Sequence, residues 1–117
     1  MADPFDRLTR QIVDALTAHL AEGKPLRIPE AGRLLFEMFT DLHASRSYSA
    51  SGPNPIGFAE IEAYARLYRW PLKAHHVRAL RRIDDAWLKH ARATSGGASD
   101  KPAPAMTADL FDAVFVS

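Results

Sequence analysis

The stretch PEAGRLLFEMFTDL, residues 29–42, decides the fold class of this chain. Its apolar residues recur at spacings of three, one, three, one and three, which draws one broad apolar stripe along a helix. These residues are Ala31, Leu34, Leu35, Met38, Phe39 and Leu42. Pro29 suits the start of a helix, and Glu30 places a negative charge near the positive end of the helix dipole. We therefore predict a helix that begins near Pro29 and packs one face on a core.

Another amphipathic helix is predicted before this stretch, between residues 3 and 23. Asp3 is a candidate N-cap, and Pro4 fits the first helical position because its fixed φ is already helical. Apolar residues follow at spacings of three and four, namely Phe5, Leu8, Ile12, Leu16 and Leu20. Gly23 is expected to end the helix, because glycine adopts the left-handed conformation common after a helix.

Two more helices are predicted after residues 45–55, which are rich in turn-forming residues and read as a loop of about ten residues. The earlier one should span residues 58–68 and face inward through Phe58, Ile61, Tyr64, Ala65 and Tyr68. The later one should begin at Trp70-Pro71, since proline suits a helix start, and run to about Ala93. The sequence thus predicts an all-α fold, a small bundle of about four helices.

One domain is expected, because 117 residues with 47% hydrophobic and 25% charged residues have the composition of a single globular unit. The predicted core gathers the apolar faces of all four helices. Its members are Phe5, Leu8, Ile12, Leu16, Leu34, Leu35, Met38, Phe39, Leu42, Ile61, Tyr64, Val77, Leu80 and Trp87.

The last part of the chain differs in composition from the helical domain, which we assign to residues 1–93. Residues 94–106 carry Gly, Ser, Ala, Pro, Asp and Lys but scarcely any large apolar side chain, which is typical of a flexible linker. Residues 107–117 are predicted to be a short apolar, amphipathic docking segment with Leu110, Phe111, Val114 and Phe115 as its contact residues. This segment either folds back onto its own helices, or enters a groove or adds a strand on a partner.

Several compositional features concern the compartment and chemistry of the protein. The chain has no cysteine, which excludes disulfides and thiolate sites and favours a cytoplasmic location. The first residues are acidic and lack the basic start of a signal peptide, and no apolar run approaches the roughly 18 residues of a membrane span. A soluble protein is expected.

Catalytic and metal sites are not predicted. His75 and His76 are adjacent, so on a helix they point about 100° apart and cannot share a metal as residues three or four apart can. Asp84 and Asp85 diverge in the same way and lack a companion nucleophile or base. We expect Asp84 to pair with Arg81 or a residue near Lys89, or to cap another element. No cofactor or enzymatic activity is expected.

His19 and His43 lack a companion set of carboxylates, and both are expected to be partly exposed surface residues.

The charge distribution is uneven. Residues 1–62 carry six Lys/Arg and nine Asp/Glu, whereas residues 63–92 carry eight Lys/Arg and two Asp/Glu. The basic helix 73–92 could therefore bind nucleic-acid phosphates through a surface of Arg78, Arg81, Arg82, Lys89 and Arg92. The basic residues of this region are expected to point in several directions, as solvated charges do, and they could equally serve internal pairs or a homo-oligomer.

Three stretches carry a resemblance to a known group of proteins. They are IPEAGRLLF at residues 28–36, GPNPIGFAEIEAYARL at residues 52–67, and WPL at 70–72 followed by VRALRRID at 77–84. In this order they resemble small tail-region proteins of tailed bacteriophages and prophages, of the tail assembly chaperone-like group. The resemblance extends to residues 110–115.

The resemblance implies a non-enzymatic assembly factor in the host bacterial cytoplasm. Its expected partner is a phage structural protein, either the tail-tube or the tape-measure protein, which it would shield until polymerisation. A small nucleic-acid-binding helical module is the alternative, and an enzyme comes third because no motif supports one.

Overall fold

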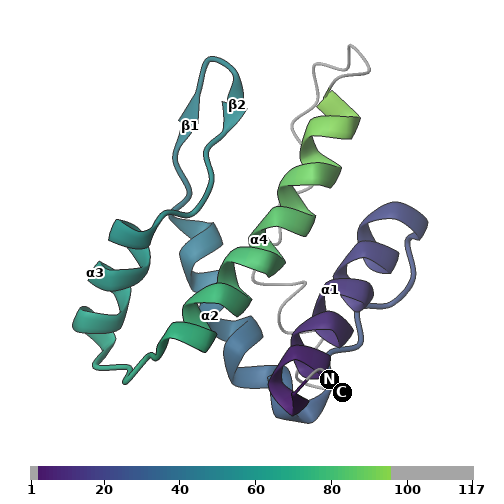
Figure 1. Ribbon diagram of the computed structural model, residues 1–117. Helices are drawn as coiled ribbons and strands as arrows, with labels where there is room; N and C mark the ends of the chain where they lie inside the picture. Colours follow the sequence, from purple (N-terminus) through teal and green to yellow (C-terminus); the bar gives the residue numbers. More distant parts are fainter. Residues whose placement is uncertain (1–2, 96–117) are drawn as a thin grey trace.

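The computed structural model describes residues 3–95, and in this part of the chain it contains four α-helices and one short hairpin (Figure 1). The α-helices are α1 (Pro4–Glu22), α2 (Arg33–Ala44), α3 (Phe58–Tyr68) and α4 (Ala74–Ser95). A 3₁₀ turn, η1 (Glu30–Gly32), leads into α2, and the strands are β1 (Tyr48–Ser49) and β2 (Gly52–Pro53). The predicted all-α class is confirmed.

The ends of α1 lie where the sequence predicts them. The Asp3 side chain caps the helix by accepting a hydrogen bond of 2.7 Å from the backbone N–H of Asp6. Gly23 closes the helix in the left-handed region at φ 71°, and its N–H donates to the carbonyl of His19. Both capping devices were visible as residue types in the sequence.

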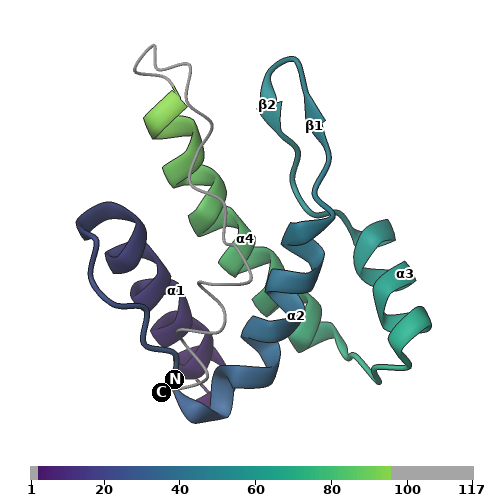
Figure 2. The same cartoon turned by 180° about the vertical axis from the view of Figure 1, so that it is seen from behind.

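Helices α1 and α4 lie side by side, with α2 behind and across them and α3 on the far side of α2 (Figures 1 and 2). The hairpin rises beyond the end of α2, on the opposite side of α4 from α1. Helix α4 is therefore the central element, because both α1 and α2 pack against it.

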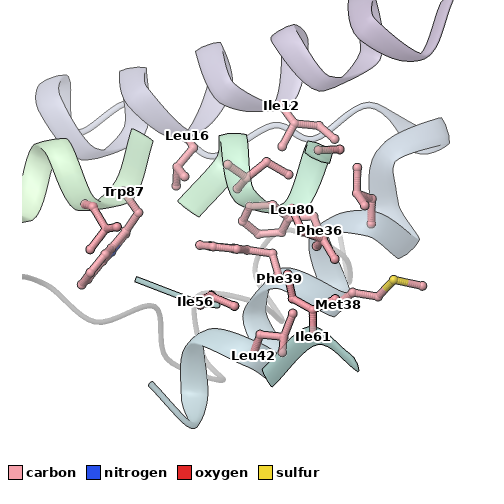
Figure 3. Packing of buried hydrophobic residues seen from close by; sticks show 14 of the residues in the cluster. Ile12, Leu16, Phe36, Met38, Phe39, Leu42, Ile56, Ile61, Leu80 and Trp87 are labelled. Carbon is pink, nitrogen blue, oxygen red and sulfur yellow. The ribbon is translucent and has the colours of Figure 1, made fainter. Parts of the chain in front are cut away.

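A single apolar core joins α1, α2, α3 and α4 (Figure 3). Most of the predicted core residues are buried, whereas Phe5, Leu8 and Val77 are partly buried at its edge. Leu34 was wrongly predicted, since 46% of it is exposed, and Phe36 is buried although the prediction omitted it. The buried face of α2 is centred between Leu35 and Phe39, about a third of a turn away from Leu34.

Helix α3 buries a narrower face than predicted. Ile61 and Tyr64 are buried, and the Tyr64 hydroxyl donates to an Asp41 carboxylate oxygen at 2.7 Å. Phe58 and Tyr68, which the pattern placed inside, are 63% and 59% exposed. The cause is the peripheral position of α3, because only one side of this helix meets the rest of the protein.

The predicted loop of residues 45–55 contains the hairpin, in which Tyr48 pairs with Pro53 and Ser49 with Gly52. Helix α4 begins at Ala74, later than the predicted Trp70-Pro71. The His76 side chain fixes that start, because its Nδ1 accepts a 2.9 Å hydrogen bond from the backbone N–H of Lys73. Trp70 instead continues the turn after α3, with its N–H donating to the carbonyl of Ala65.

Candidate protein-interaction surfaces

The predicted docking residues Leu110, Phe111, Val114 and Phe115 lie outside the described residues, as do the other residues after Ser95. Their role stays a prediction. Residues 3–95 present a charged face on α4, a groove between α1 and α4, a groove at the start of α1 and an exposed apolar side of α3.

The charged face belongs to α4. Five basic residues lie within about 100° of one another around the helix axis, and each is exposed. They are the predicted surface residues Arg78, Arg81, Arg82, Lys89 and Arg92. The expectation that the charges of this region point in several directions is wrong for these five. Asp85 is the one acidic residue that this exposed face carries within residues 74–95.

The face forms a stripe along the helix rather than a compact cluster. Arg78 and Arg92 are fourteen positions apart, which corresponds to about 21 Å at the α-helical rise. Arg82 approaches Asp6 of α1, with Nη1 3.7 Å from a carboxylate oxygen, and both side chains are about half exposed. The Arg81 guanidinium lies 4.2 Å from the ring centre of Phe58, a cation–π contact that partly shields this exposed aromatic side chain.

A groove of about 460 Å³ runs between α1 and α4 beside this charged stripe. Small and apolar groups form its floor, from Val13, Thr17 and Ala21 on α1 and from Ala86 on α4. Its α4 edge carries Arg82, Asp85, Lys89 and His90. The groove exists because short side chains face each other where two longer ones would have closed the space between the helices.

A second, more apolar groove of about 440 Å³ lies at the start of α1. Pro4, Phe5 and Leu8 of α1 and Ala31 of η1 form most of it. Phe5 also contacts the rings of His75 and His76 edge-on, at centroid distances of 4.6 and 5.5 Å, so this groove lies near the first turn of α4.

The outer side of α3 exposes large apolar groups. Leu67 is 80% exposed, and Tyr68 stands clear of the core while its ring lies 4.6 Å from that of Tyr64. Exposed apolar side chains are common singly, so α3 alone does not define a binding site.

A polar cluster inside the protein was missed by the sequence reasoning. Arg46, after the end of α2, forms a buried ion pair with Asp84 of α4, and its Nη1 donates to the carbonyl of Asn54 at 2.8 Å. The guanidinium also lies 4.4 Å from the ring centre of Trp87. The second Asp84 oxygen accepts from the N–H of Ile56 at 2.9 Å. The cluster ties α4 to both ends of the hairpin segment.

His43 belongs to the same cluster, contrary to the expectation of a partly exposed surface residue. It is 6% exposed, its Nδ1 accepts a 3.0 Å hydrogen bond from Nε of Arg46, and its ring lies edge-on to Trp87. Burial, together with the adjacent Arg46 charge, lowers the pKa of His43 to about 4. The imidazole is therefore neutral in the folded protein near pH 7.

His75 and His76, which were also singled out in the sequence, have structural partners at the start of α4. The side chain of His76 caps the start of α4, and its pKa is lowered, mainly by burial and further by the nearby His75 and Lys73.

Within residues 3–95, no group of three or more His, Cys, Asp or Glu side chains could hold a metal ion. The same described residues include no helix long and apolar enough to cross a membrane.

A family model described as phage tail assembly chaperone matches residues 14–89, which is more than half of the chain. The matched region includes α1 from Asp14 onward, all of α2 and α3, and α4 as far as Lys89. Neither a curated protein nor a solved structure matches.

Proposed function

Because this chain belongs to the phage tail assembly chaperone family and so serves tail assembly in the host cell, we propose that it acts by binding the tail-tube or tape-measure protein before polymerisation. The observation that carries the proposal is the family match over residues 14–89. The action is non-enzymatic and takes place in the host bacterial cytoplasm.

The proposed contact residues are Leu110, Phe111, Val114 and Phe115 in the docking segment 107–117. Burial of one large apolar side chain contributes about 1.5–3 kcal/mol, so four of them supply a useful affinity without a large rigid interface. Aromatic residues are frequent among the side chains that dominate interface energies. In this scheme residues 1–93 are the scaffold and residues 94–106 are the tether.

The test is co-purification of the tagged full-length chain with the tail-tube or tape-measure protein of the same phage, expressed together and treated with nuclease. A double variant, Phe111→Ser with Phe115→Ser, should lower partner recovery by about tenfold or more if these rings are interface hot spots. Ala113→Ser, a small change in the same segment, is the matched control and should leave recovery unchanged.

Truncation after Ser95 separates binding from folding. Circular dichroism of the truncated chain should retain the helical signal, because the four helices of residues 3–95 and the core that they form lie before this point. Its partner recovery should equal that of the double variant. Full recovery with the double variant would refute the role of the segment, and absence of both tail proteins from the full-length sample would refute the function.

A second candidate function, nucleic-acid binding by residues 73–92, is favoured by the five basic residues that share one exposed face of α4. Phosphate contacts make such binding fall steeply as salt rises, because each releases a counterion. Titration of a labelled DNA or RNA duplex at several salt concentrations tests this candidate. A steep salt slope, reduced in an Arg78→Gln and Lys89→Gln double variant, would support it, and the absence of binding at low salt would refute it.

A further inference from the structure

The groove between α1 and α4 combines two properties that suit a particular kind of ligand. Its floor is formed by Val13, Ala21 and Ala86, which offer apolar surface, while its α4 edge carries Arg82 and Lys89 with one acidic residue, Asp85, between them. An apolar peptide that also carries carboxylates would satisfy both parts, with its apolar side chains on the floor and its charges near the basic edge.

We propose that this groove binds residues 107–117 of the same chain, as a resting position for the docking segment. The segment has the required composition, since it carries the apolar residues named above together with Asp109 and Asp112, and it contains no basic residue. The occupant is therefore an apolar and acidic peptide that is covalently attached to the protein that offers the groove.

The length of the attachment supports this occupant. Ala86, on the floor, lies nine helical positions before Ser95, which corresponds to about 14 Å along α4. Fifteen positions separate Ser95 from Leu110, and a chain of linker composition spans about 20 Å on root-mean-square average over that number of residues. The tether is thus matched to the distance that it must cover.

A matched tether gives a high effective concentration. Short flexible linkers produce millimolar values, so a segment with a dissociation constant of ~1 mM for the groove would be docked about half of the time. At this effective concentration, weak contacts with a small groove are enough to keep the segment docked about half of the time.

The second apolar groove is a poorer match for the same segment. It lies near the first turn of α4, as the contact of Phe5 with His75 shows, whereas the chain leaves the helical domain at the last turn of α4. The two ends of α4 are about 32 Å apart, which exceeds the average span of the tether.

A resting position would give the protein a closed and an open form. In the closed form the α1–α4 groove covers the apolar segment, and a tail protein competes with the groove for this segment. This competition rests on the proposed function, whereas the docking itself does not, because it needs no partner. The two can therefore fail separately.

The absence of cysteine allows a direct test in the full-length chain without partner. A nitroxide is attached through Ser117→Cys, and amide signals are compared in NMR spectra before and after its reduction. With about half of the chains docked, the amides of Thr17, Ala86 and Lys89 should lose about half or more of their intensity, whereas those of Leu8 and Ala31 at the second groove should not.

Charge reversal supplies the matched pair of variants. Lys89→Glu should lower the ratio of docked to undocked chains by about two- to fivefold, the range for one exposed ion pair, while Lys73→Glu, outside the groove, should not change it. Equal effects of the two variants would overturn the role of the basic edge.

Three other patterns of NMR signal loss overturn the proposal. Loss of signal at Leu8 and Ala31 would place the segment in the second groove. A second experiment mixes nitroxide-labelled chains with isotope-enriched chains that carry no nitroxide. Loss of amide signal in this mixture would show that the segment of a second copy occupies the groove. Uniform or absent loss would show that the groove does not bind the segment.

Discussion

At the scale of single residues, the buried ion pair of Arg46 and Asp84 is the contact that the sequence conceals best. Asp84 was expected to pair with Arg81 or a residue near Lys89, and that prediction is wrong because Arg46 is its partner. The alternative, that Asp84 caps another element, comes closer, because Asp84 accepts a hydrogen bond from the N–H of Ile56, two residues before α3 begins. Arg46 could not be identified because it lies 38 positions away, in a segment that reads as a loop.

Asp84→Ala should lower the free energy of unfolding by about 3–5 kcal/mol, because it leaves the buried guanidinium of Arg46 without its carboxylate. The neighbouring Asp85→Ala removes an exposed carboxylate and should change stability by less than about 0.5 kcal/mol. Urea unfolding followed by circular dichroism measures both. A similar loss for the two variants would contradict a special role for the buried pair.

The lowered pKa of His43 predicts a pH-dependent contribution to stability. The folded pKa is about 4 and the ordinary value is 6.5, so between these values the unfolded state takes up a proton that the folded state does not. The free energy of unfolding should therefore fall as pH decreases from about 6.5 to about 4, by at most about 1.4 kcal/mol per pH unit from this residue. The contribution should be constant above and below that window.

Direct measurement of this titration is available by NMR. The imidazole signals of His43 should change with a midpoint near pH 4. The His43→Gln variant keeps a hydrogen-bond acceptor for Arg46. Its free energy of unfolding should lack the part of the pH dependence that His43 contributes. A His43 midpoint near 6.5 would show that the imidazole is solvated.

At the scale of elements, the close approach of η1 to α1 depends on Gly32. A Cβ at this position would lie 2.6 Å from Cδ1 of Ile12, a buried core atom. Gly32→Ala should therefore destabilise the protein by about 1–3 kcal/mol through overpacking, although alanine favours helix. Ala31→Ser, at the exposed neighbouring position, is the control in the same thermal or urea unfolding experiment. An unchanged Gly32→Ala protein would mean that η1 moves away from α1 without cost.

The sequence predicted the helices better than their boundaries and faces. Periodic apolar residues and caps were sufficient for α1, because Asp3 and Gly23 act locally. The start of α4 depends on the His76 side chain, and the outward position of Phe58 depends on what lies beside α3. Such features arise from tertiary neighbours and have no local signal.

At the scale of the whole molecule, one candidate surface can be derived from the sequence and another cannot. The basic face of α4 follows from helical spacing alone, so the sequence contained it even though the charges were read as scattered. The α1–α4 groove could not be predicted, because Thr17 and Ala86 are far apart in sequence and meet only when the helices pack. A periodicity identifies one face of a helix but not its neighbour.

The tip of the hairpin is a suitable place for inserted residues, because the hairpin is held at its base. Arg46 and Asp84 fix its base from inside the protein, while its tip, Ala50 and Ser51, is exposed and lies on the far side of α4 from α1 (Figure 1). Exposed loop tips are the sites where inserted residues are best accommodated. An epitope or fluorescent-label sequence placed between Ala50 and Ser51 would thus report on the protein during tail formation while leaving both the groove and the chain after Ser95 unmodified.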